Sequence, residues 1–178
     1  SSLAPAAGAP GWPHARGPDW TGQSPETALA DEWPAAGPPV LWTFPLGQGY
    51  SALIACGGRV FTQAQTPLGQ FASALDATTG RRLWATRYDD PFDPEGHWPG
   101  PRATPTFAQG RLYVAGTDGA LHCLDADSGR RLWSADLAAR WEGARRAAEG
   151  ARTHADKAAA WRMAPEVERA EREAEQAF

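Results

Sequence analysis

The stretch ALDATTGRRLW, residues 74–84, returns as CLDADSGRRLW at residues 123–133. A near-repeat at a period of roughly 50 residues is typical of folds that stack one supersecondary unit several times. The repeat therefore decides the fold class, and the residues around each copy show what one unit contains.

Four short strands are predicted in each unit. In the first unit, the runs YSALIAC and RVFTQAQ flank a Gly-Gly turn, which is a hairpin signature, and FASALDA and RRLWATRY follow. The second unit repeats this order as RATPTFA, RLYVAG, ALHCLD and RRLWSAD. Turn signals at this spacing are typical of a β-propeller or a β-sandwich, so we expect two antiparallel four-stranded meanders.

The repeated turn residues have mechanical roles. Gly80 and Gly129 stand where a tight turn requires positive φ, which glycine adopts at little cost. Asp76 and Asp125 precede those turns, where a short carboxylate can accept hydrogen bonds from turn amides. Because both copies carry them, we interpret these aspartates as structural rather than catalytic.

A tryptophan occurs at one fixed place in each unit. Trp84 and Trp133 lie in the fourth predicted strand, and VLWTFPL at residues 40–46 puts Trp42 in a similar strand ahead of both units. One large aromatic side chain per unit predicts a peg wedged between neighbouring sheets. An aromatic ligand cage is the alternative interpretation.

The pattern A-x-D-x-x-T-G-x-x-x-W resembles the tryptophan-docking repeat of the PQQ-like, quinoprotein-type β-propeller family, a WD40-like architecture. The first copy matches at Ala74, Asp76, Thr79, Gly80 and Trp84, whereas the second has Cys123, Asp125, Ser128, Gly129 and Trp133. The segment before the first unit is similar to the leader of secreted bacterial members. The resemblance spans about residues 12–137 and implies a partial propeller, related in fold to the outer-membrane assembly propeller lipoprotein.

Composition divides the chain into four segments. We expect a flexible linker at 1–11, a leader at 12–39, an incomplete propeller at 40–137 and a helical tail at 138–178. Propellers carry about four to eight blades, so two blades and one extra outer strand do not close a ring. The fold prediction is mainly β, with open sheet edges through which the chain could associate with itself.

The tail is rich in Ala, Glu and Arg, which are strong helix formers. Trp141 and Trp161 are its only large anchors for a contact. Three interpretations stay open: a partner-binding helix, a helix that covers the edge of the second blade, and the product of a truncated or frame-disturbed gene.

No catalytic, cofactor-binding or metal-ligating residue is predicted, because no two histidines share a metal-ligand spacing. The related PQQ-dependent dehydrogenases carry a calcium-bound quinone and often a vicinal cysteine pair, which this chain lacks. We therefore expect no cofactor and a non-catalytic scaffold or protein-interaction module. The alternative is a fragment of a PQQ-dependent dehydrogenase or of a propeller sensor domain.

The net charge of −4 gives no support for binding to nucleic acid, and no apolar run is long enough to span a bilayer. Cys56 and Cys123 fit small apolar strand residues, and a disulfide between them stays open. The resemblance implies a periplasmic or secreted protein with an unidentified protein partner.

Overall fold

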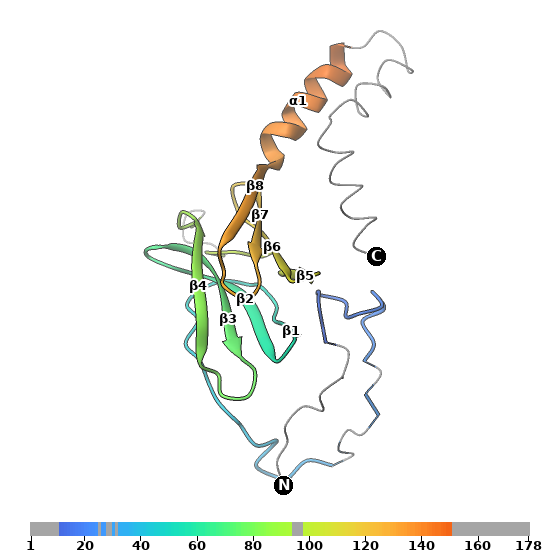
Figure 1. Cartoon of the computed structure of the whole chain (residues 1–178), viewed down its shortest axis with the longest axis vertical. Helices are drawn as coiled ribbons and strands as arrows, with labels where there is room; N and C mark the ends of the chain where they lie inside the picture. The colour runs from blue at the N-terminus through green and yellow to red at the C-terminus, as the bar shows by residue number, and fades with distance from the viewer. Residues whose placement is uncertain (1–10, 25, 28–29, 31, 94–97, 151–178) are drawn as a thin grey trace.

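The computed structural model describes residues 11–24, 26–27, 30, 32–93 and 98–150, with backbone alone at 144–150. Two four-stranded antiparallel sheets and one helix follow in chain order (Figure 1). The first sheet contains β1 (Ile54–Cys56), β2 (Arg59–Thr66), β3 (Gly69–Asp76) and β4 (Arg82–Asp89). The second contains β5 (Thr106–Ala108), β6 (Arg111–Ala115), β7 (Ala120–Asp125) and β8 (Arg131–Asp136), and α1 spans Leu137–Gly150. Both predicted meanders, and the mainly β fold class, are confirmed.

The two sheets meet through an apolar seam that the strand register explains. Phe61 on β2 lies opposite Ala74 on β3, which pairs with Trp84 on β4. Cross-strand partners share one face of a sheet, so all three face the second sheet. There the Phe61 ring stacks on Phe107 of β5, with centroids 5.9 Å apart, and the buried Leu112 belongs to the same cluster.

Polar side chains continue this seam toward the end of β4. Gln70 is fully buried, and its amide donates to Asp89 Oδ2 at 3.0 Å and to Thr117 Oγ1, in the turn between β6 and β7 of the second sheet, at 2.6 Å. The Tyr88 ring lies 5.5 Å from the buried imidazole of His122. A seam with both apolar packing and cross-sheet hydrogen bonds fixes one relative placement of the two sheets.

The leader contacts the free edge of both sheets. Trp12 exchanges two backbone hydrogen bonds with Ala55 of β1, at 2.6 and 3.0 Å. The next carbonyl, that of Pro13, accepts from the amide of Phe107 on β5 at 2.8 Å. The leader thus satisfies edge amides on β1 and β5 that would otherwise lack a backbone partner.

Residues 40–46 differ from the extra strand that the sequence predicts. They form no strand ladder, and the first pairing of this segment is an isolated bridge between Gln48 and Gln65. A ladder needs a neighbouring strand, and β2 already pairs with β1 and β3. The segment is held instead by the Trp42 side chain.

The helix α1 begins directly after β8. The carboxylate of Asp136 accepts from the amide of Ala139 at 2.8 Å, as an N-cap residue does. Figure 1 shows α1 pointing away from the sheets, and Trp141 is 58% exposed. Trp161 and the rest of the tail lie outside the described residues, so the three interpretations of the tail stay open.

Candidate interaction site

Trp84 reaches across the seam to the last turn of the second sheet. Its indole Nε1–H donates to the carbonyl of Ala126 at 3.0 Å. A Cβ atom added to Gly129 would lie 2.6 Å from the Trp84 ring, so only glycine leaves room for the indole. Thr86 adds a second link by donating to the carbonyl of Gly129 at 2.6 Å. Ala126 and Gly129 form what we call the second socket.

The aspartate before each turn holds the socket in shape. Asp125 Oδ1 accepts from the amide of Ser128 at 2.8 Å and from its hydroxyl at 2.6 Å. Asp76 makes the equivalent bonds to Thr79, both at 2.8 Å. The hydroxyl bond, followed by the amide bond, lowers the pKa of each carboxyl because both stabilise the charged form. The turn therefore keeps its geometry at neutral pH.

Trp42 occupies the equivalent socket of the first sheet. Its Nε1–H donates to the carbonyl of Ala77 at 3.0 Å, the same distance as in the second socket. A Cβ atom on Gly80 would lie 2.5 Å from the Trp42 ring. Ala77 and Gly80 form the first socket, and a segment that belongs to neither sheet fills it.

Trp133 is the third tryptophan of the series and has no socket among the described residues. It lies beside Cys123 on β7 and 6.0 Å from the Tyr113 ring, centroid to centroid. Its side chain is half-buried, and within the described part of the chain its indole N–H has no acceptor. The chain thus presents three pegs and two described sockets.

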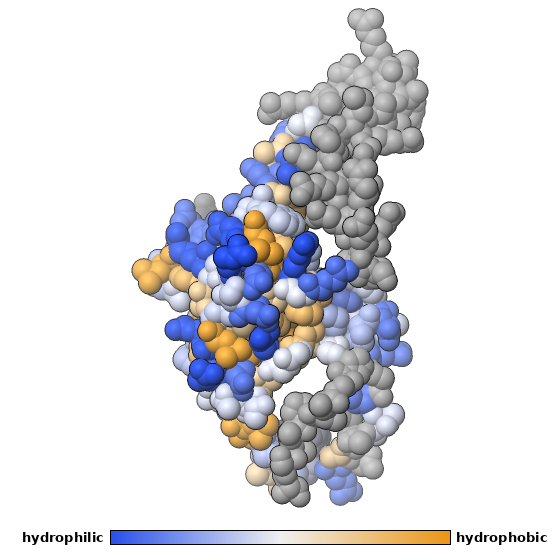
Figure 2. Space-filling model, in the orientation of Figure 1, coloured by the Kyte–Doolittle hydropathy of each residue, from blue (hydrophilic) through white to orange (hydrophobic). Residues whose placement is uncertain are grey.

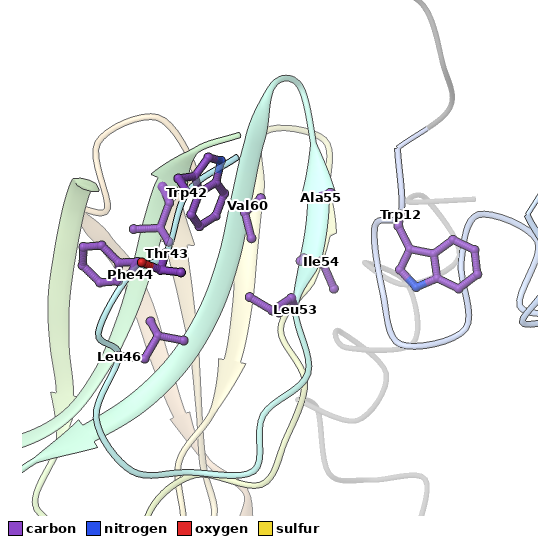
Figure 3. Close-up of a pocket in the computed structure, with 10 residues that line it drawn as sticks. Trp12, Trp42, Thr43, Phe44, Leu46, Leu53, Ile54, Ala55 and Val60 are labelled. Carbon is purple, nitrogen blue, oxygen red and sulfur yellow. The ribbon is translucent and has the colours of Figure 1, made fainter. Parts of the chain in front are cut away.

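An apolar hollow of about 540 Å³ opens on the outer face of the first sheet. Figure 3 shows Trp42, Phe44 and Leu46 on one side of it, and Leu53 and Val60 facing them from the first sheet. Leu53 is 55% exposed. This face is therefore only partly covered by the segment that carries Trp42.

Two exposed aromatic side chains pair where the connection between the sheets meets the segment before β1. Tyr50 and Trp98 are 51% and 63% exposed, and their ring centroids are 5.3 Å apart. The amide of Tyr50 donates to the carbonyl of Pro101 at 2.8 Å, and Gln65 accepts from the amide of Phe92 at 2.8 Å. The first bond joins Tyr50 to the connection, and the second joins the connection to β2. We call the surface around Tyr50, Leu68 and Trp98 the loop face.

The sequence did not point to the loop face. Its two aromatic residues are far apart in the chain, and Trp98 has a φ of 59°, which few non-glycine residues adopt. Leu68, 76% exposed, lies in the turn between β2 and β3, where Figure 2 shows an apolar protrusion. The proline-rich composition of residues 88–102 was the one available signal, and it indicated a stiff connection.

The cysteines lie on different sheets. Cys56 on β1 and Cys123 on β7 are both buried, and no disulfide joins them. Burial raises the pKa of the Cys56 thiol to about 11. Among the described residues, no group of three or more His, Cys, Asp or Glu side chains is arranged to hold a metal ion. The described helix is too short and too polar to cross a membrane.

A family model described as outer membrane protein assembly factor BamB matches residues 68–170. The chain belongs to this family. The BamB match starts later than the resemblance inferred from the motif, and it extends past residue 137, where we expected it to stop. A BamB protein of Aliivibrio fischeri is 30% identical over 89 residues, which are 50% of this chain and 21% of that protein.

One solved structure supports the fold, and a second is more distantly similar. The quinohemoprotein alcohol dehydrogenase of Comamonas testosteroni aligns with a TM-score of 0.50 at 23% identity, over 71% of this chain and 19% of that one. A europium-containing methanol dehydrogenase aligns with a TM-score of 0.44 at 20% identity, over 55% of this chain and 18% of that one. The chain spans about a fifth of the length of these relatives. The predicted partial propeller of PQQ-like repeats is confirmed.

Proposed function

We propose that this chain acts as a protein-interaction scaffold of the bacterial cell envelope, with the loop face as its contact surface. The pair of exposed aromatic rings at Tyr50 and Trp98 carries this proposal. Large aromatic side chains dominate the binding energy of many protein interfaces because they bury much area at little entropic cost.

The rigidity of the underlying fold supports the same role. Gln48 exchanges two backbone hydrogen bonds with Gln65 of β2, and the amide of Tyr50 donates to the carbonyl of Pro101. The segment that carries Tyr50 is therefore held in place before a partner binds, so it loses little conformational freedom on binding. The matching family is described as an assembly factor for outer membrane proteins, an activity that depends on protein contacts. The same relationship supports an envelope location.

Site-specific photo-crosslinking in intact cells tests the proposal. A photoreactive phenylalanine at position 98 should give one discrete adduct with another envelope protein. The matched control is position 83, because Leu83 is 37% exposed and lies at the other end of β4. A Tyr50→Ala/Trp98→Ala variant should lose binding to the protein in that adduct without a change in melting temperature. Equal adducts at positions 83 and 98 would overturn the proposal.

The enzyme alternative is separated by a quinone-binding assay. The purified chain is incubated with PQQ and calcium, desalted and examined by absorbance and by dye-linked alcohol oxidation. Under the scaffold proposal, quinone is lost on desalting and no alcohol is oxidised. Retained quinone with dye reduction would favour a dehydrogenase fragment instead.

A further inference from the structure

Three segments of the chain share one short pattern. Leu41-Trp42-Thr43, Leu83-Trp84-Ala85 and Leu132-Trp133-Ser134 each place a tryptophan after a leucine. The first two tryptophans fill the two described sockets with the same 3.0 Å hydrogen bond. Trp133 is an equivalent peg with no described socket. If Trp42 left the first socket, the socket would therefore fit Trp133 as well as it fits Trp42.

The open face of the second sheet and the hollow face of the first sheet also repeat the residue positions that meet in the seam. In the seam, Phe61 packs against Phe107, and Leu112 and Leu124 belong to the same cluster. By the repeat, Tyr113 stands in the place of Phe61 on the open face of the second sheet. The hollow face of the first sheet offers Ala55, Val60 and Leu75 in the places of Phe107, Leu112 and Leu124.

One polar contact of the seam also has a counterpart. In the seam, Arg131 donates to the backbone carbonyl of Arg87 at 3.0 Å. Between two chains, the repeat would place Arg82 in the role of Arg131 and the backbone carbonyl of Asp136 in the role of the Arg87 carbonyl. This arginine-to-carbonyl hydrogen bond is therefore available again, whereas the ion pair between Arg59 and Asp127 is replaced by Arg111 and Thr78.

We propose that Trp42 occupies the first socket and so blocks the binding of a second copy of this chain. When Trp42 leaves, Trp133 of the second copy binds in the socket. Trp42 is tethered to the sheet it covers, so it competes at an effective concentration on the order of mM. The contact is head-to-tail, and such contacts close into rings or grow into filaments. With two blades among the described residues of each chain, two to four copies would match the roughly four to eight blades of known propellers.

Light scattering coupled to size-exclusion chromatography tests this on the full chain. Trp42→Ala should strengthen self-association by about tenfold or more, because the internal competitor is gone. Trp42→Ala/Trp133→Ala should return to the mass of the wild type, whereas Trp42→Ala/Trp141→Ala, which changes an exposed tryptophan of α1, should stay assembled. Trp42→Phe fills the socket without the N–H group and should give an intermediate shift.

A thiol cross-link reports the geometry itself. Arg59 pairs with Asp127 across the internal seam, and Arg111 and Thr78 hold the same repeat positions. An arginine–carboxylate pair spans more than a disulfide can bridge, so a short bismaleimide is used as the cross-linker. Thr78→Cys and Arg111→Cys in the Trp42→Ala background should give cross-linked dimers, and the same pair with Trp42 retained should give far fewer. If neither Trp42→Ala nor Trp42→Phe changed the mass in solution, the proposal would be overturned. Assembly that persists without Trp133, or equal cross-linking with and without Trp42, would also overturn it.

Discussion

Replacing Trp84 with alanine tests whether the seam between the sheets depends on the docked indole. The variant removes one half-buried indole ring, which packs beside Phe61 and fills the space above Gly129. It also removes the hydrogen bond from that indole to the carbonyl of Ala126. It leaves both sheets with their own ladders intact. Any loss of stability therefore reports the contact between them.

The magnitude follows from the contacts. A buried tryptophan hides about 150 to 250 Å², so a half-buried one hides about 100 Å², worth about 2.5 kcal/mol at about 25 cal/mol per Å². Loss of the indole hydrogen bond adds about 1 kcal/mol. We expect Trp84→Ala to lower the free energy of unfolding by about 3 to 4 kcal/mol, within the range seen for large aromatic truncations. Trp84→Phe, which keeps most of the ring area, should cost about half as much.

Urea unfolding followed by far-ultraviolet circular dichroism measures the change. Trp33→Ala is the matched control, since Trp33 is 61% exposed and should change stability by less than about 0.5 kcal/mol. If Trp84→Ala were no more destabilising than Trp33→Ala, the docking argument for the seam would be refuted.

Three other outcomes are expected. Gly129→Ala should lower the free energy of unfolding by about 3 kcal/mol, and Gly110→Ala by about 1 kcal/mol. Both glycines have positive φ, but only at Gly129 would the new Cβ meet the Trp84 ring. Urea titrations of the two variants measure the difference. Burial lowers the pKa of His122, so the unfolded chain binds a proton at this residue before the folded chain does. The contribution of His122 to the free energy of unfolding should therefore be fully present above about pH 6.5 and fall as the pH drops below it. His122→Gln should flatten that dependence between pH 7.5 and 5.5, and an unchanged slope would contradict it. Burial raises the Cys56 pKa to about 11, so its thiol should react with Ellman's reagent far more slowly at pH 8 in the native chain than in guanidinium.

Most of the sheet architecture was predictable from local patterns. Glycine turns and alternating apolar residues marked all eight strands, and the repeat of Asp76 and Asp125 marked the two equivalent turns. These signals are local because a hairpin is set by the turn and by the residues beside it. The propeller class followed from the repeat and from its resemblance to a known family.

The rest depends on contacts between distant residues. The run at 40–46 has the composition of a strand, yet it forms no ladder and is held by the hydrogen bond from the Trp42 side chain to Ala77. The pairing of Tyr50 with Trp98 depends on the path of the connection, which includes an unusual φ at Trp98. No periodicity or motif in a single sequence reports such a path.

The hydrogen bonds of the leader have a consequence for the order of folding. Trp12 and Pro13 leave the ribosome first, but Ala55 follows much later and Phe107 comes only after the whole first sheet has been made. The leader therefore cannot take its final position until β5 has formed beside β1. Contacts this distant in sequence form late, because closing a long loop costs entropy before any contact compensates it. Complete docking of the leader thus marks the moment when both sheets are assembled, and a chain halted before β5 would leave the Pro13 carbonyl without its partner on Phe107.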